Sequence, residues 1–172
     1  GVTVNKIRAF EQWMNLVFPL HTLGVRLSYL PPHENFPDMT FTANAGFFRD
    51  GKIIVSNFKH EERRGESGEV CSYFLDILGF PVSVLPASRG NIPIFFEGQG
   101  DALWYGENTL VCGYGFRSNQ EGIQAIHDSA RCGRFISLEL VKEHFYHLDT
   151  CFCPIGEDIL WYPPAFSFES RK

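Results

Sequence analysis

The order of predicted elements is the feature of this sequence that most restricts its fold. Two strands joined by a tight turn are followed by a helix and a further strand, and this order recurs about two and a half times over 172 residues. The first unit has a hairpin turn at Asp50-Gly51, a helix at 66–78 and a strand at 81–85; the second has strands at 103–105 and 109–114, a helix at 120–130 and a strand at 134–138. Sequence identity between the units is too weak to define a repeat. The chain is therefore predicted to be an α/β protein of ββαβ modules, with polar strand ends facing one central cleft.

Further segments complete the expected structure. A helix is predicted over residues 3–18, where apolar residues recur at helical spacing, and a strand over 25–30, which ends at a double proline. Residues 39–44 alternate apolar and polar types, which is typical of a strand with one polar face. Strands at 146–153 and 159–162 form the remaining half unit.

Composition and charge restrict the class of protein. Hydrophobic residues make up 44% of the chain and charged residues 20%, so we expect one globular domain over residues 1–172. The net charge of -5 and the lack of a basic stripe argue against nucleic acid as a partner. No apolar run approaches the roughly 18 residues of a membrane span, so no membrane partner is expected. Five cysteines without CxxC spacing favour free thiols and a cytoplasmic location.

The segment Phe145–Phe152 contains the first candidate for a functional site. It places His147 and Asp149 two residues apart in an otherwise apolar, aromatic run. Alternate residues of a strand point to the same side, so both side chains are expected to project into one cavity. Burying two titratable groups costs free energy unless they pair or bind a ligand. A core histidine satisfied by a neighbouring carboxylate is the structural alternative.

Two upstream segments share this composition. Residues 38–44 and 97–101 insert acidic or amide groups among Phe, Leu and Gly. Structural roles are available for each, because Asp38 fits a turn after proline, Asn44 fits a left-handed turn position and Asp101 fits a cap. Taken together, the three segments indicate a carboxylate-rich pocket with one histidine, suited to a cation.

A divalent metal ion is one candidate for that cation. His147, Asp149 and Glu97 offer ligands, but no second histidine lies at metal-ligand spacing, and HxxxH and CxxC are absent. Several carboxylates also recognise a guanidinium group, which is planar and donates in pairs. We therefore expect neither a metal nor another cofactor, and a small molecule bearing a guanidinium.

Five segments, at 37–46, 60–66, 96–101, 115–118 and 147–150, match the guanidino-group modifying enzymes in order and approximate spacing. The chain thus resembles this family, the penteins, which includes arginine deiminase, dimethylarginine dimethylaminohydrolase and the amidinotransferases. The resemblance spans nearly the whole chain and implies a pentein-type five-bladed α/β propeller with a central active site. The Ala43-Asn44 pair, where an arginine deiminase has Arg-Asp, looks most like the arginine dihydrolase branch.

The resemblance implies roles at the guanidino end of an L-arginine substrate. His147 would be the general acid and base that makes the departing amine a good leaving group. Glu97 and Asp149 would pair with the guanidinium nitrogens, and Asp101 is grouped with these substrate-binding residues. Asn44 would be the catalytic-site residue that replaces the aspartate of the deiminases.

At the other end of the substrate, the resemblance implies two arginines. Arg63 and Arg117 would hold the α-carboxylate, and Asp38 would lie near the α-amino group. Arg64 is an alternative to Arg63, because a shift of one residue decides between them.

Asn44 bears on the expected product. An aspartate would repel the neutral ureido oxygen of citrulline, whereas an asparagine NH₂ can donate to it. We therefore expect a second hydrolysis, which converts arginine to ornithine, two ammonia molecules and carbon dioxide. Hydrolysis to citrulline, amidinotransfer, hydrolysis of a dimethylarginine-type substrate and binding of arginine without turnover are the alternatives.

The nucleophile is where the chain departs from the family. The resemblance implies a catalytic cysteine far downstream of residues 147–150, acting through a covalent thioether intermediate. Cys151 and Cys153 are too close to His147 in sequence for their thiols to face its side chain. Cys71 and Cys112 are interpreted as small hydrophobic core residues. We therefore expect an inactive fragment lacking the C-terminal module or modules, or else a degenerate binding form. The resulting incomplete propeller would expose strand edges, which is compatible with a homo-oligomer.

Overall fold

The computed structural model describes residues 4–172, and the chain divides into two compact units, Gly1–Pro31 and Pro32–Lys172. The first unit contains helix α1 (Lys6–Thr22), which begins after an Asn5 cap and continues four residues beyond the predicted end. Residue 3 of the predicted helix lies outside the described residues. That the two units form one domain stays a prediction.

The strand predicted at 25–30 is wrong, because these residues have no regular secondary structure. Within this segment, the ring of Tyr29 lies 5.5 Å from that of Trp13 on α1. In the part of the chain that the structure describes, no helix has the length and apolar character that a membrane crossing requires. A cytoplasmic location stays a prediction.

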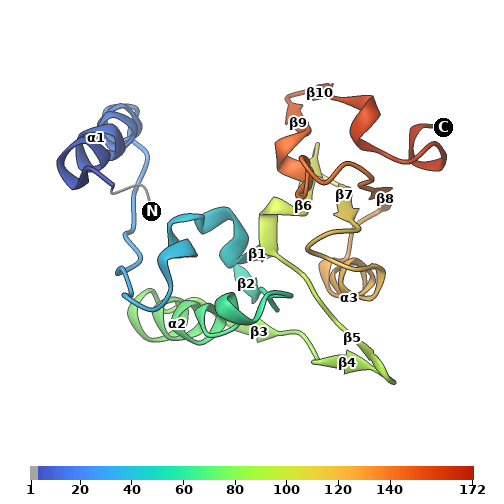
Figure 1. The fold of residues 1–172 in the computed structure, drawn as a ribbon, viewed down its shortest axis with the longest axis horizontal. Helices are drawn as coiled ribbons and strands as arrows, with labels where there is room; N and C mark the ends of the chain where they lie inside the picture. The colour runs from blue at the N-terminus through green and yellow to red at the C-terminus, as the bar shows by residue number, and fades with distance from the viewer. Residues whose placement is uncertain (1–3) are drawn as a thin grey trace. The chain divides into compact units, whose positions relative to one another are not determined.

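The second unit contains two modules of the same topology (Figure 1). The first consists of β1 (Gly46–Arg49), β2 (Lys52–Val55), α2 (Glu66–Ser72) and β3 (Val82–Val84). The second consists of β6 (Ala102–Tyr105), β7 (Thr109–Tyr114), α3 (Gln120–Ala130) and β8 (Arg134–Glu139). In each module the first two strands pair antiparallel, and the strand after the helix pairs parallel with the second strand. The predicted ββαβ modules are confirmed.

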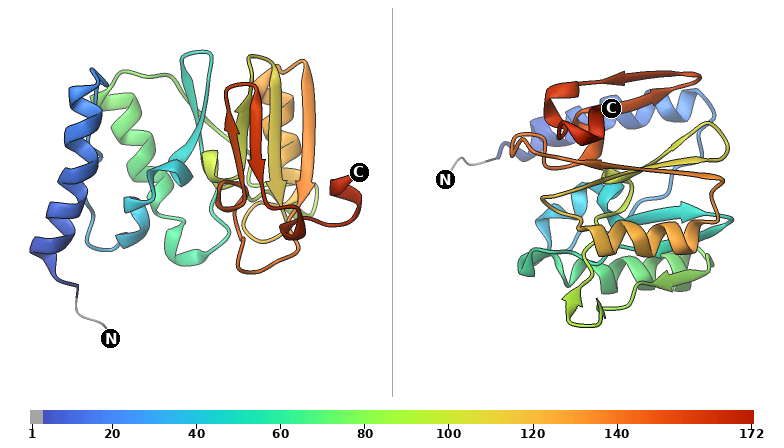
Figure 2. Two further views of the ribbon diagram at one scale, coloured as in Figure 1. Left: turned by 90° about the horizontal axis from the view of Figure 1, so that it is seen from above. Right: turned by 90° about the vertical axis from the view of Figure 1, so that its right-hand side faces the viewer.

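A third hairpin, β9 (Phe152–Ile155) and β10 (Asp158–Trp161), follows the second module. It lies on the face of the β6–β7–β8 sheet opposite to α3 (Figure 2). A short hairpin between the modules, β4 (Ser88–Arg89) and β5 (Ile92–Pro93), falls where the sequence predicts a loop. Helix α2 continues into a π-helical turn, Tyr73–Ile77, before Gly79 reverses the chain at a φ of 68°.

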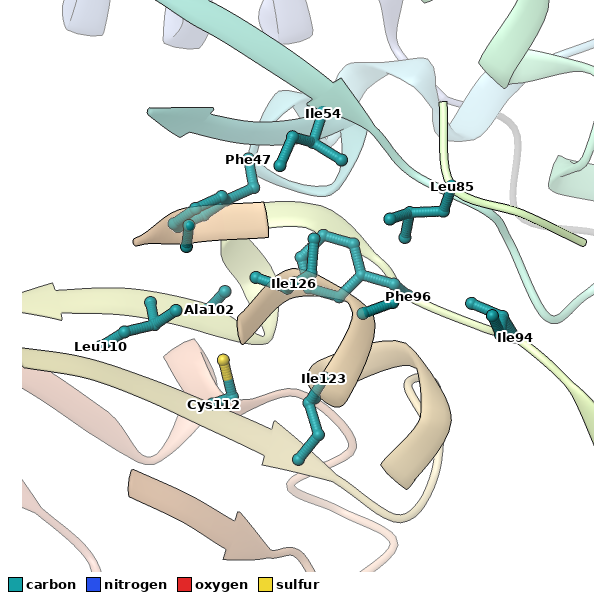
Figure 3. Close-up of a cluster of buried hydrophobic side chains, with 12 residues drawn as sticks. Phe47, Ile54, Leu85, Ile94, Phe96, Ala102, Leu110, Cys112, Ile123 and Ile126 are labelled. Atoms are coloured by element: carbon teal, nitrogen blue, oxygen red, sulfur yellow. The ribbon is translucent and has the colours of Figure 1, made fainter. Parts of the chain in front are cut away.

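The hydrophobic core joins the two modules (Figure 3). Phe47 of β1, Phe96, Leu110 of β7 and Ile126 of α3 are fully buried in one cluster. Burial of such side chains contributes about 1.5–3 kcal/mol each, so this cluster fixes the modules relative to each other.

A second cluster lies on the other face of the β6–β7–β8 sheet. Neighbouring residues of a strand point to opposite faces, so Val111 enters this cluster while Leu110 enters the first. Leu148, Phe152 and Phe166 complete its centre. With both faces covered, the second module is a rigid support for the residues that connect it to the third hairpin.

Two strand predictions at the candidate site are wrong. Residues 39–44 lie in two 3₁₀ turns, Pro37–Thr40 and Thr42–Ala45, rather than in a strand. The segment 146–153 is likewise a 3₁₀ turn, Leu148–Thr150, and β9 begins only at Phe152. In each case one polar residue is buried, Asn44 in the first segment and His147 in the second, whereas Thr42 and Asp149 stay exposed.

Candidate active site

Three 3₁₀ turns meet at one place and form the floor of the site. Thr42–Ala45, Gly98–Gly100 and Leu148–Thr150 each lie immediately before the first strand of a hairpin, namely β1, β6 and β9. The middle turn packs against both of the others. Because the topology repeats, residues that are far apart in sequence come to equivalent positions around one centre.

Two glycines allow this close approach. A Cβ on Gly98, whose φ is 62°, would lie 2.6 Å from the carbonyl oxygen of Ala43. A Cβ on Gly100 would overlap the Asn44 side-chain nitrogen and lie 3.3 Å from His147 Nδ1. The Gly-x-Gly spacing therefore leaves room for Asn44 and His147 to meet over the turn.

His147 is at the centre of the site and is 4% exposed. It directly precedes the turn Leu148–Thr150, and its ring contacts side chains at the other two turns. Its Nε2 lies 3.4 Å from Glu97 Oε2, and its Nδ1 lies 3.1 Å from Asp101 Oδ2. The Nδ1 contact is electrostatic rather than an aligned hydrogen bond.

The pKa of His147 reflects two opposing effects. Burial favours the neutral ring, but the carboxylates of Asp101 and Glu97 outweigh burial and raise the pKa to about 9. The imidazole is therefore protonated at neutral pH and can donate a proton.

This shift predicts a pH dependence of stability. A folded-state pKa of about 9, above the unfolded value of 6.5, gives a stabilisation that is complete below pH 6.5 and lost as the pH rises through 9. As the pH rises across that window and His147 loses its proton, we expect the free energy of unfolding to fall by about 3 kcal/mol. Urea titrations of the wild type and of His147→Asn over this pH range measure the effect. The exposed-site control His144→Asn should keep the pH slope of the wild type. A His147→Asn variant with that same slope would contradict the prediction.

Glu97 is the carboxylate around which the cations gather, and it is fully buried. Its Oε2 lies 3.2 Å from Arg117 Nη1, 3.4 Å from His147 Nε2 and 3.7 Å from Arg63 Nη1. Burial opposes ionisation, but His147, Arg117 and Arg63 together lower the pKa of Glu97. Its Oε1 has no hydrogen-bond partner within residues 4–172.

Asp101 links the site to the backbone. Its Oδ1 accepts a hydrogen bond from Leu148 N at 3.1 Å, and its Oδ2 accepts one from Ser118 Oγ at 2.6 Å. Ser118 Oγ in turn accepts from Glu97 N at 3.0 Å. Asp101 thus lies behind His147 rather than facing the pocket.

Asn44 lies in the turn Thr42–Ala45 and is also buried. Its Nδ2 is 3.3 Å from His147 Nε2 and donates to the Glu97 carbonyl oxygen at 3.4 Å. Its Oδ1 accepts from Arg63 Nη1 at 3.5 Å. The amide is thereby oriented with its NH₂ toward the imidazole.

Arg63 is 4% exposed and is held by Glu66, the first residue of α2. Its Nε and Nη2 donate to the two carboxylate oxygens of Glu66, both at 2.8 Å. The Oδ2 of Asp38 lies 3.9 Å from the same Nε. Arg64, the alternative by one residue, is exposed and donates to the carbonyl oxygen of Lys59.

A pocket of about 390 Å³ opens above this network. That volume suits a small polar ligand. Two of the three floor turns, Thr42–Ala45 and Leu148–Thr150, contribute lining residues, and the turn Gly98–Gly100 does not. The full lining is Asp38, Phe41, Asn44, Arg63, Arg117, Tyr146, His147, Asp149 and Thr150.

Six of the eight residues singled out in the sequence line this pocket, and Glu97 and Asp101 lie beneath it. Asp149 borders the pocket although it does not share a strand with His147, and its side chain is exposed. Among the described residues, Asp149 forms no ion pair with the two arginines.

All five cysteines are free, and none lines the pocket. Cys151 is the nearest in sequence to His147, but its Sγ lies against the backbone oxygens of His147 and Leu148 at 3.8 and 3.6 Å. Burial raises the pKa of the Cys151 thiol to about 11. Burial also raises the pKa of Cys112 well above its ordinary value, so neither thiol is activated as a nucleophile.

Sequence reasoning missed three residues with a part in this geometry. Glu66 holds Arg63, and its i to i+3 spacing from Arg63 was the available signal. Ser118 bridges Glu97 and Asp101, and Tyr146 lies against Arg117. The last two directly neighbour predicted site residues, but their own side chains give no signal in the sequence.

Comparison with known proteins places this geometry in a family. The model of the N,N dimethylarginine dimethylhydrolase family, eukaryotic type, matches residues 2–162. The chain belongs to this family. The wider pentein superfamily and its α/β fold, implied by the resemblance in the sequence, are thereby confirmed.

Relatives of this dimethylarginine dimethylhydrolase family member include two kinds of enzyme. The bifunctional arginine dihydrolase/ornithine cyclodeaminase ArgZ of Synechocystis sp. is 41% identical over 96% of this chain and 23% of the relative. The N(G),N(G)-dimethylarginine dimethylaminohydrolase of Mycobacterium tuberculosis is 38% identical over 95% of this chain and 51% of the relative. The chain thus spans about a quarter to a half of these relatives.

Solved structures agree with this family assignment. The substrate-bound N-terminal domain of ArgZ, in a cysteine-to-serine variant, has a TM-score of 0.86 and 40% identity, over 95% of this chain and 58% of that one. A dimethylarginine dimethylaminohydrolase adduct has a TM-score of 0.74 and 25% identity, over 91% of this chain and 61% of that one.

Proposed function

We propose that the chain forms the substrate-binding part of a guanidino-group hydrolase acting on L-arginine, within one catalytic domain. The observation that supports this most is the buried pair of His147 and Glu97, 3.4 Å apart, beneath a 390 Å³ pocket that two arginines border. Relatives named as an arginine dihydrolase and a dimethylarginine dimethylaminohydrolase support the guanidino substrate. A solved relative, a variant of AgrE, is described as a complex with L-arginine.

The geometry suits both halves of such a reaction. Glu97 and Asp149 supply negative charge for a guanidinium, which is poorly electrophilic until its orientation is fixed. His147, protonated at neutral pH, would give its proton to the departing ammonia and then act as base for the attacking water. Arg117, Arg63 and Asp38 would receive the amino-acid end of the substrate.

The nucleophile is not assigned to a residue of this chain. A thiolate is the expected attacking group, and one solved relative is described as covalently bound to a reaction intermediate. Because no cysteine of residues 4–172 lines the pocket, arginine binding without turnover is the second candidate function for this chain.

Product analysis tests the proposal. The gene product is incubated with L-arginine, and citrulline, ornithine and ammonia are quantified over time. Ornithine with about two ammonia per arginine supports a dihydrolase, since two hydrolyses release two ammonia molecules. The asparagine NH₂ would favour the second hydrolysis by donating to the ureido oxygen of bound citrulline. Citrulline alone supports a deiminase, and a product that appears only with an added amine supports a transferase. Failure of L-arginine to bind would overturn the proposal.

Asn44→Asp is expected to stop the reaction at citrulline. The Asn44 NH₂ lies 3.3 Å from His147 Nε2, where it can donate to the ureido oxygen, whereas a carboxylate there repels that oxygen. We expect ornithine formation to fall about 100-fold, which corresponds to a lost hydrogen bond plus repulsion of about 3 kcal/mol. Time courses of the wild type, Asn44→Asp and the exposed-site control Asn91→Asp measure the ratio of the two products. An Asn44→Asp enzyme that still runs on to ornithine would rule out this role.

A further inference from the structure

The two arginines that border the pocket differ in how many of their donors are already used. Arg63 is 4% exposed, and both its Nε and its Nη2 donate to Glu66 in a bidentate pair. Arg117 donates a single side-chain hydrogen bond within residues 4–172, from Nη1 to Glu97 Oε2, and its side chain is 23% exposed. Arg117 is therefore the guanidinium with free donors toward the pocket, and a ligand carboxylate can accept from it in bidentate fashion.

An aromatic ring fixes the position of that guanidinium. The Arg117 guanidinium carbon lies 5.0 Å from the ring centroid of Tyr146, within the range of a cation–π interaction. The same ring lies 5.2 Å from the ring of His147, tilted by 60°. Tyr146 thus lies between the group that would bind an anion and the group that would transfer a proton.

Tyr146 also forms part of the pocket wall and is 43% exposed. It belongs to the loop between β8 and the turn Leu148–Thr150, and no core cluster includes it. A change at this position is therefore expected to alter the pocket and leave the fold intact.

We propose that Tyr146 is a specificity-determining residue, whose ring holds Arg117 at the pocket so that the site favours guanidino compounds with a carboxylate at the far end. The proposal rests on the proposed function in that L-arginine is taken as the ligand. A guanidino compound without the carboxylate gains nothing from Arg117, so loss of the Tyr146 ring is expected to weaken its binding much less than that of a compound with the carboxylate.

The test compares two ligands that differ only in the carboxylate. Isothermal titration calorimetry gives the affinities of L-arginine and of its decarboxylated analogue, agmatine, for the wild-type chain, Tyr146→Phe and Tyr146→Ala. We expect Tyr146→Ala to weaken L-arginine binding about 3- to 10-fold and to leave agmatine within about twofold. Tyr146→Phe keeps the ring and should match the wild type for both ligands. Tyr162→Ala removes an exposed tyrosine that does not line the pocket and should also match the wild type.

Each contrary outcome has a distinct meaning. Equal loss of both ligands, or of neither, in Tyr146→Ala overturns the specificity role while the proposed function stands. A loss in Tyr146→Phe as large as in Tyr146→Ala assigns the effect to the hydroxyl and overturns the role of the ring. A wild-type chain that binds no L-arginine overturns the proposed function and this proposal together.

A measurement without ligand checks the contact itself. The Arg117 Nε–H resonance, assigned with Arg117→Lys, is expected to show a ring-current shift in the wild type and in Tyr146→Phe. That shift should vanish in Tyr146→Ala while the other amide resonances keep their positions. A resonance that is unchanged in Tyr146→Ala would show that the ring does not hold the guanidinium.

Discussion

Glu97→Gln is expected to weaken L-arginine binding at least about 100-fold and to lower the free energy of unfolding by about 3 kcal/mol. Glutamine has the shape of glutamate, so no cavity forms. The change removes the only charge on the Glu97 side chain, whose Oε2 lies within 3.7 Å of Arg63, Arg117 and His147. Three buried or half-buried cations then share one site without that carboxylate, and a guanidinium ligand would add a fourth.

Calorimetric titration with L-arginine and urea unfolding measure the two effects of Glu97→Gln. Glu107→Gln, in the exposed β6–β7 turn, makes the same chemical change away from the site and should match the wild type. The pKa of His147, followed by NMR, should also fall from about 9 toward 6.5 because one of its two carboxylates is lost. A variant that keeps the wild-type affinity and His147 pKa would contradict the central role of Glu97.

Gly100→Ala is expected to abolish the alignment of the site and to destabilise the fold by about 1–3 kcal/mol. The added methyl group would overlap the Asn44 side-chain nitrogen and lie 3.3 Å from His147 Nδ1. Asn44 is buried and its NH₂ donates to the Glu97 carbonyl oxygen, so it cannot move aside without losing that bond. We expect L-arginine affinity to fall about tenfold or more, since one lost hydrogen bond to a buried group costs about 1–3 kcal/mol.

The control substitution, Gly68→Ala, is expected to change the free energy of unfolding in the opposite direction. Gly68 lies in α2, and a Cβ there would meet nothing within 4 Å. Gly68→Ala should therefore raise the free energy of unfolding by about 0.5–1 kcal/mol, because alanine loses less backbone entropy in a helix. Urea unfolding of both variants measures the contrast. Equal effects of the two substitutions would show that the close approach at Gly100 does not matter.

The modules could be predicted from sequence because their determinants are local. The helix over 120–130 has the predicted bounds, and the Asp50-Gly51 turn produces the predicted hairpin. Periodicity and turn residues act within a few positions of the chain, and they agree with the tertiary fold in both modules. By contrast, the strand expected at 25–30 has no partner strand, and the pairing that a strand requires is not a local property.

The site residues could also be predicted from the sequence, but their geometry could not. Alternation placed His147 and Asp149 side by side on a strand, whereas a 3₁₀ turn buries the first and exposes the second. A short polar and apolar alternation fits both a strand and a tight turn, and local propensity does not distinguish them. Which arginine faces the pocket was likewise open until the backbone showed Arg63 buried and Arg64 exposed.

By itself, the sequence determined the ββαβ modules and the polar segments before each hairpin. The spacing of apolar residues and the residue types at turns depend only on positions close together in the chain. Only the tertiary structure decided that three turns from different modules meet at Gly98 and Gly100. It also decided that Tyr146 lies against Arg117. These contacts depend on packing across the core, which brings together residues about 20 to 100 positions apart and leaves no trace in local sequence.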